Sequence, residues 1–173
     1  MKIHFIRHSE AIDHSVDGPD AHRYLTCRGR TRFRRVAASL KKMGIDPDII
    51  ITSPLIRAVQ TADILAELLR FSGELSITPA LAPGFNLSNL KDLLLSHNDA
   101  GEIVMVGHEP DLGNLVQMLL GISYSCNLRK GAVVSVEIHR KQPEQEPEFL
   151  GYVTGGGKVI LNQHKALERL KAQ

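Results

Sequence analysis

The sequence predicts an α/β protein, a three-layer sandwich in which helices cover both faces of a mostly parallel central sheet. Short runs of β-branched residues alternate with segments of helical periodicity over the first two thirds of the 173 residues, an order typical of parallel sheets. Two further strand-like runs near the end predict an antiparallel hairpin at one sheet edge. The length suits a single domain, taken as residues 1–173.

The first strand and helix are expected before residue 45. Residues 2–7 form a compact apolar run that predicts a buried strand, and the polar stretch over 9–24 predicts a loop. Thr26 is a suitable N-cap for a helix that continues to Lys42, with Gly44 just past its end.

The second strand, over residues 48–52, is indicated by three consecutive isoleucines. Ser53 and Pro54 then have the order of an N-cap followed by proline at the first helical position. Apolar residues recur at helical spacing up to Leu69. Residues 74–78 are expected to form a third strand.

The third βα unit follows a helix capped by Ser88. Residues 102–106 read as the clearest central strand, because four apolar residues follow one another there. Pro110 is expected to open a helix that runs to Leu120 and ends at Gly121.

The last third is expected to complete the sheet. Residues 132–138 alternate apolar and polar side chains, and 149–154 are predicted to pair with them across a linker that contains Pro143 and Pro147. Residues 163–171 have the pattern of a terminal helix.

Composition excludes several classes of protein. Apolar residues make up 43%, charged residues 23%, and the formal net charge is +2, which is ordinary for a soluble protein and favours neither nucleic acid nor membrane. No apolar run reaches the roughly 18 residues of a membrane span, and the N-terminus does not have a signal-peptide pattern. Cys27 and Cys126 fit no zinc or redox spacing. We therefore expect a cytoplasmic protein without a metal site.

Unusual polar residues follow three of the predicted strands. Arg7 and His8 end the first strand, Ser53 follows the second with Arg57 one turn into the next helix, and His108 follows the strand at 102–106. Ligands bind beyond the carboxyl ends of parallel strands, where helix N-termini also provide free N–H groups. Two arginines and two histidines at this edge predict a site for a phosphate dianion.

Ordered motifs then resemble a known family. Residues 7–10 (RHSE) resemble the Arg-His-Gly signature of the histidine phosphatase superfamily, which includes phosphoglycerate mutases and many phosphatases. Residues 53–62 resemble its second block and 106–108 its third. The short length and the segments at 25–29 and 81–84 are similar to the SixA-type protein phosphohistidine phosphatases. The resemblance covers about the first 140 residues.

The resemblance implies a covalent mechanism without metal or cofactor. His8 would be the nucleophile and take the phosphoryl group on one ring nitrogen, while the other nitrogen donates to a backbone carbonyl. Arg7 and Arg57 would bind the phosphoryl oxygens, and His108, if protonated, would add positive charge.

Two departures from the family pattern concern the edge of this site. Ser9 stands where the family usually has glycine, so a positive φ there would be strained. Larger relatives have a general acid near the middle of the chain, whereas residues 83–86 (PGFN) here contain no carboxylate. Glu109 and Glu10 therefore remain as candidate acids or supporting residues. His22 and Ser53, like Ser9, are expected at the pocket edge.

The missing acid favours hydrolysis of phosphohistidine on a protein, because imidazole leaves more easily near neutral pH than an alkoxide. The alternatives are a phosphatase for small phosphate esters or anhydrides and a non-catalytic phosphate- or phosphoprotein-binding module. The sequence does not predict an oligomeric state. Five arginines near one helix start form either a solvated face or a docking site for an acidic partner: Arg28, Arg30, Arg32, Arg34 and Arg35.

Overall fold

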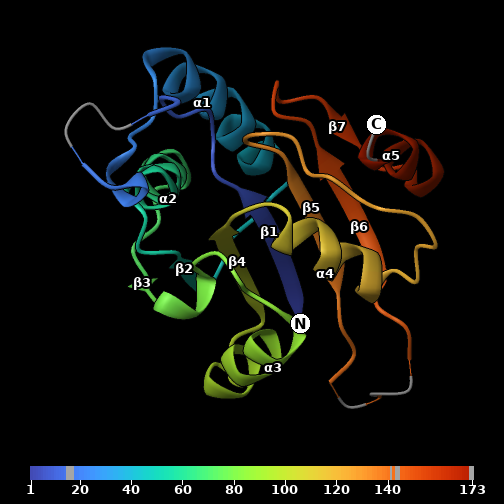
Figure 1. Ribbon diagram of the computed structural model, residues 1–173. Helices are drawn as coiled ribbons and strands as arrows, with labels where there is room; N and C mark the ends of the chain where they lie inside the picture. Colours follow the sequence, from blue (N-terminus) through green and yellow to red (C-terminus); the bar gives the residue numbers. More distant parts are fainter. Residues whose placement is uncertain (15–17, 141, 143–144, 172–173) are drawn as a thin grey trace.

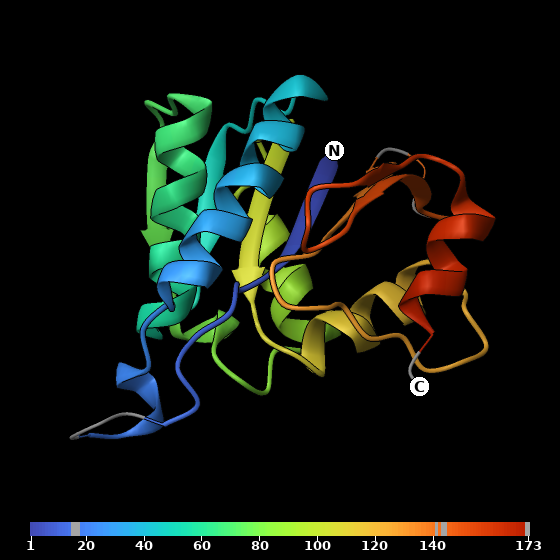
Figure 2. The same ribbon diagram turned by 90° about the horizontal axis from the view of Figure 1, so that it is seen from above.

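The computed structural model describes residues 1–14, 18–140, 142 and 145–171 (Figures 1 and 2). A seven-stranded sheet with the order β3-β2-β4-β1-β5-β6-β7 runs through it. The strands are β1 Lys2–Arg7, β2 Ile49–Thr52, β3 Glu74–Ile77, β4 Glu102–Gly107, β5 Val133–Glu137, β6 Glu148–Val153 and β7 Val159–Ile160. The helices are α1 Cys27–Lys42, α2 Ile56–Leu69, α3 Leu87–Ser96, α4 Asp111–Leu119 and α5 Gln163–Leu170, with short 3-10 turns η1 Asp20–His22 and η2 Pro79–Leu81.

The sheet has a parallel half and an antiparallel half. β1 pairs in parallel with β4, β4 with β2, and β2 with β3. β5 runs antiparallel to β1, and β6 and β7 continue this half. The predicted mixed α/β sheet is therefore confirmed, and the carboxyl ends of β1, β2 and β4 lie at the same edge.

Two apolar cores cover the two faces of the sheet. Ile6 and Val104 belong to the core beneath α1 and α2. Ile3 and Phe5, which alternate with Ile6 along β1 and point to the opposite face, belong to the core beneath α3, α4 and α5. Figure 2 shows α1 and α2 together on one side of the sheet.

Two predicted helix starts are wrong. Ser53 is fully buried and does not cap α2, which begins at Ile56 after Leu55, so Pro54 lies before the helix. The Ser53 hydroxyl instead contacts His108. The cap of α3 is Asn86 rather than Ser88; its side chain accepts from two helix amides and Asn89 completes a capping box.

The other predicted elements are present, with ends shifted by a residue or two. β7 was not predicted, because two residues are too few to give a periodic signal. The predicted hairpin linker includes Pro143, which lies outside the described residues. In the described part of the chain, each helix is too short or too polar to cross a membrane.

Candidate active site

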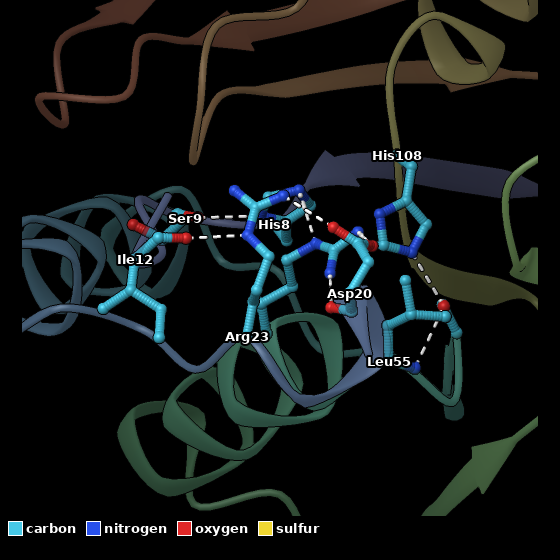
Figure 3. Close-up of polar contacts among 9 residues, drawn as sticks. His8, Ser9, Ile12, Asp20, Arg23, Leu55 and His108 are labelled. Atoms are coloured by element: carbon cyan, nitrogen blue, oxygen red, sulfur yellow. Dashed lines mark hydrogen bonds and ion pairs between the residues drawn. The ribbon is translucent and has the colours of Figure 1, made fainter. Parts of the chain in front are cut away.

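His8 lies just past the end of β1, at the carboxyl edge of the parallel strands (Figure 3). Its Nδ1 is 2.7 Å from the Ser9 carbonyl oxygen, and its Nε2 is 3.3 Å from Nε of Arg57. A carbonyl oxygen only accepts and a guanidinium N–H only donates. His8 is therefore held in the tautomer with hydrogen on Nδ1, and the lone pair of Nε2 faces a cation.

The surroundings of His8 keep its ring neutral. The pKa of His8 is lowered to about 3, mainly by burial and also by the nearby His108, Arg57 and Arg7, while the hydrogen bond to Ser9 opposes the shift. A neutral imidazole keeps its lone pair over the whole range near neutral pH, as a nucleophile requires.

His108 follows β4, and its ring centroid lies 5.1 Å from that of His8. Its Nε2 is 2.8 Å from Oγ of Ser53, while its buried Nδ1 has no hydrogen-bond partner among the described residues. Figure 3 shows this Nδ1 on the side of the ring where His8 and Asp20 lie. A group placed between the two imidazoles would meet this nitrogen.

Burial lowers the pKa of His108 to about 4, with Arg57 acting in the same direction and Asp20 against it. The expected positive charge depended on a protonated His108, and burial favours the neutral ring instead. A neutral His108 still serves as a donor: if the Ser53 hydroxyl donates to Nε2, the hydrogen lies on Nδ1.

Arg57, in the first turn of α2, is only 5% exposed. Its Nη1 donates to the Asp20 carbonyl at 2.9 Å and its Nη2 to the Asp20 carboxylate at 2.8 Å. Arg23 holds the other carboxylate oxygen of Asp20 at 2.8 Å, which lowers the pKa of Asp20 (Figure 3). The sequence analysis missed Asp20, because a carboxylate in a polar loop carries no periodic or motif signal.

Arg7 reaches the site from the last position of β1. Its Nη1 donates to the Leu128 carbonyl at 2.6 Å, and its buried Nε has no partner among the described residues. Its charge is felt at both His8 and His108. Arg7 thus has Nη1 bound to a backbone carbonyl, while its Nε–H donor is unpaired among the described residues.

Glu109, next to His108, is partly buried beside the same segment as Arg7. Its Oε1 accepts from the Leu128 amide at 3.2 Å. Burial raises the pKa of Glu109 to about 7, while Arg7 and the backbone amides of Leu128 and Gly113 oppose this shift. A carboxyl group with this pKa can hold a proton near neutral pH.

The side chains of the remaining candidates make no hydrogen bond to either imidazole in the described part of the chain. Ser9 is buried, donates to the Gly29 carbonyl at 2.9 Å, and does not have positive φ; in the described residues Arg70 is the one non-glycine that does. Glu10 pairs with Arg28 and Arg32, so its arginine partners are on α1 rather than in the site.

His22 belongs to η1 and is exposed. The loop after β1 does reach the site as expected, but through Asp20. Within the described residues, the structure shows no cluster of three or more metal-ligating side chains. The geometry thus brings His8, Arg57 and His108 together, with Arg7 close enough to act on both histidines.

Comparisons with known proteins identify the family of the chain. Residues 3–82 match the model of the histidine phosphatase superfamily (branch 1). An uncharacterized protein of Picosynechococcus sp. is 35% identical over 144 residues, 79% of this chain and 84% of that protein. The chain belongs to the histidine phosphatase superfamily.

Relatives with a named activity have lower sequence identity to this chain. The mitochondrial serine/threonine-protein phosphatase Pgam5 of Drosophila ananassae is 27% identical over 158 residues; the match covers 91% of this chain but 47% of that protein. The structure of the protein histidine phosphatase SixA complexed with tungstate superposes with a TM-score of 0.79 at 22% identity, covering 90% of this chain and 97% of SixA. This similarity shows the same fold.

Proposed function

We propose that this protein is a phosphatase that forms a phosphohistidine intermediate on His8 and acts on phosphohistidine carried by another protein. The observation that carries the proposal is the fixed tautomer of His8. Nδ1 is committed to the Ser9 carbonyl, while Nε2 presents a lone pair beside the guanidinium of Arg57. A nucleophilic nitrogen next to a cation suits attack on an anionic phosphoryl group.

In the first step, Nε2 of His8 forms a bond to phosphorus as the bond to the leaving group breaks. Arg57 and the free Nε–H of Arg7 hold the non-bridging oxygens, and Nδ1–H of His108 donates to the same group. In the second step, water attacks phosphorus, the Nε2–P bond breaks, and inorganic phosphate leaves with the proton lost by the water. No step calls for a metal ion.

The leaving group supports phosphohistidine as the substrate. An imidazole with an ordinary pKa of about 6.5 departs near neutral pH more readily than an alkoxide. Transfer between two imidazoles is also nearly balanced in energy. The fold shared with SixA, whose structure is titled a protein histidine phosphatase, is consistent with this choice.

Glu109 favours a second candidate, a phosphatase for small esters or for phosphoserine and phosphothreonine. Its pKa of about 7 would let it deliver a proton to an alkoxide. In that case Glu109→Gln abolishes hydrolysis of alkyl phosphates and spares phosphohistidine. Loss of both activities to the same degree would assign Glu109 a structural role.

Trapping the intermediate tests the proposal directly. Brief incubation with a ³²P-phosphohistidine protein, followed by denaturation, should leave label that is acid-labile and base-stable on wild type and absent from His8→Ala. His4→Leu is the matched control, since His4 is a buried histidine on the same strand. Label on His8→Ala, or faster turnover of phosphoserine than of phosphohistidine, contradicts the proposal.

A further inference from the structure

A strongly basic hollow of about 600 Å³ lies beside the catalytic residues, and the proposed reaction does not use it. Its cationic residues come from α1, the segment before β5, the turn before β7, and α5 (Figure 1). Half of the ten lining residues carry positive charge: Arg32, Arg129, Lys158, Arg169 and Lys171. Glu168 is the one carboxylate among these ten residues.

Most of this positive charge is not neutralised within the described residues. Lys171 is paired with Glu168, and Arg32 lies 3.7 Å from the Glu10 carboxylate. Arg129, Lys158 and Arg169 are exposed and have no carboxylate within ion-pair distance in the described part of the chain. For a chain whose formal net charge is only +2, this concentration of cations indicates an anionic ligand.

One lining residue of the basic hollow, Arg129, belongs to a segment that contacts the catalytic residues. Arg7 donates to the Leu128 carbonyl, and the Gly131 amide donates to the His8 carbonyl at 3.1 Å, so Arg129 projects from a segment fixed to the nucleophile. The turn before β7 packs onto this segment, since a Cβ on Gly155 would lie 2.2 Å from the Lys130 carbonyl oxygen. Glycine at that position permits the close approach.

The positive surface extends beyond what a compact ligand would fill. A neighbouring hollow of about 560 Å³ shares Arg32 and adds Arg28 and Arg35. Another, of about 570 Å³, shares Lys158, Glu168 and Arg169 and adds Lys165 beside the apolar Val159, Ile160 and Leu161. Cations spread over three adjoining hollows fit an extended chain of carboxylates better than a single small anion.

From this we infer that the surface around Arg32, Arg129, Lys158 and Arg169 binds an acidic segment of the protein substrate, next to its phosphohistidine. The inference rests on the proposed function for the phosphoryl group, but the surface itself requires only an acidic polypeptide. Attraction between these charges raises the rate of productive encounter and weakens with salt over a Debye length of about 8–10 Å.

Charge reversal at two positions tests this surface. The variant Arg129→Glu/Arg169→Glu is compared with Lys42→Glu/Lys91→Glu, whose lysines are exposed and lie outside the three hollows. Each double variant changes the formal net charge from +2 to −2, because each reversal changes it by two. The substrates are two phosphohistidine peptides, one flanked by Asp and Glu and one by Asn and Gln, together with p-nitrophenyl phosphate.

We expect the Arg129/Arg169 variant to lose at least about tenfold in kcat/KM on the acidic peptide. Its kcat/KM on the neutral peptide and on p-nitrophenyl phosphate should stay within about twofold. The lysine control should match wild type on all three substrates. Equal loss on both peptides, or an unchanged preference for the acidic one, overturns the inference.

A binding measurement separates this inference from the proposed function. The unphosphorylated acidic peptide, followed by fluorescence anisotropy, should bind wild type and His8→Ala equally and bind the Arg129/Arg169 variant at least about tenfold more weakly. If wild type does not hydrolyse phosphohistidine but this pattern holds, the proposed function fails and the surface stands. If tripolyphosphate displaces the peptide and binds more tightly at equal charge, the occupant is a small polyanion and the inference is overturned.

Discussion

His4 within β1 and His8 just past its end have opposite environments, although they are four residues apart. His8 stands at the carboxyl edge of the sheet beside Arg57 and His108. His4 is fully buried within the sheet, with Nδ1 2.7 Å from Oγ of Ser135 and Nε2 3.2 Å from Oε1 of Glu102.

The residue types around His4 are those of a hydrolase triad, a serine, a histidine and a carboxylate. Yet Ser135 is 1% exposed and His4 is fully buried, so no substrate can reach them. His8 instead has one nitrogen engaged by a carbonyl and the other beside a cation. The comparison teaches that a nucleophile is recognised by an available lone pair and nearby counter-charge, rather than by which residue types meet.

The largest effect expected from this difference concerns the two histidines themselves. His8→Ala should reduce phosphatase kcat by at least about a thousandfold, because no other group can accept the phosphoryl. His4→Leu should keep kcat within about threefold but lower the melting temperature, since it leaves Ser135 without its His4 partner and removes one of the hydrogen bonds to Glu102. Steady-state kinetics and thermal denaturation check both. A large loss of kcat in a folded His4→Leu would contradict the assignment of a catalytic role to His8 and a structural role to His4.

Two serines extend the comparison, since each contacts one histidine. Ser53 lies 2.8 Å from Nε2 of His108, whereas Ser135 lies 2.7 Å from Nδ1 of His4. Ser53→Ala should lower kcat about tenfold, because His108 is then free to place its hydrogen on Nε2, away from the phosphoryl group.

Ser135→Ala should leave kcat unchanged and reduce the free energy of unfolding by about 1–3 kcal/mol. Urea denaturation at neutral pH measures this loss.

Ser53→Thr, which keeps the hydroxyl, is the conservative control and should recover most of the kcat. If Ser53→Ala and Ser53→Thr lose activity equally, crowding rather than the hydrogen bond is responsible.

Two carboxylates sharpen the contrast through pH. Burial raises the pKa of Glu109 to about 7. Burial also raises the pKa of Glu102, but the hydrogen bonds from His4 and the Asp46 amide outweigh it and leave this pKa below its usual value. The folded state therefore binds a proton at Glu109 more strongly than the unfolded chain does, and at Glu102 less strongly.

The signs of the two stability effects follow by linkage. Because of Glu109, the free energy of unfolding of the wild type falls as pH rises from about 4.5 through 7. Glu109→Gln should abolish this fall, which is on the order of 1–2 kcal/mol after allowance for solvent screening. Glu102 contributes stability above its unfolded pKa that is lost as pH falls, so Glu102→Gln should cost most at neutral pH. Urea denaturation between pH 4 and pH 8 measures both slopes; parallel slopes would show that the two carboxylates do not differ.

The sequence predicted the parts of this site that depend on topology. Arg7, His8 and His108 follow parallel strands, and the strand order brings such positions to one edge regardless of the intervening loops. The neutral state of His108 could not be predicted, because it depends on burial by segments distant in sequence. Asp20 was missed for the same reason, since only the folded loop brings its carboxylate to Arg57.

Asp20 gives the smallest expected effect and shows whether the cation beside His8 is available to phosphate. Its carboxylate is 59% exposed while the guanidinium it holds is almost completely buried, so the carboxylate is the partner that can move aside. A phosphoryl dianion must share Arg57 with this like charge or displace it. Asp20→Asn should therefore tighten competitive inhibition by inorganic phosphate about threefold, with kcat nearly unchanged. Asp13→Asn is the control, because Asp13 is an exposed carboxylate of the same loop with no ion pair in the described part of the chain. Weaker phosphate binding in Asp20→Asn would mean that this carboxylate orients Arg57 for the dianion rather than competing with it.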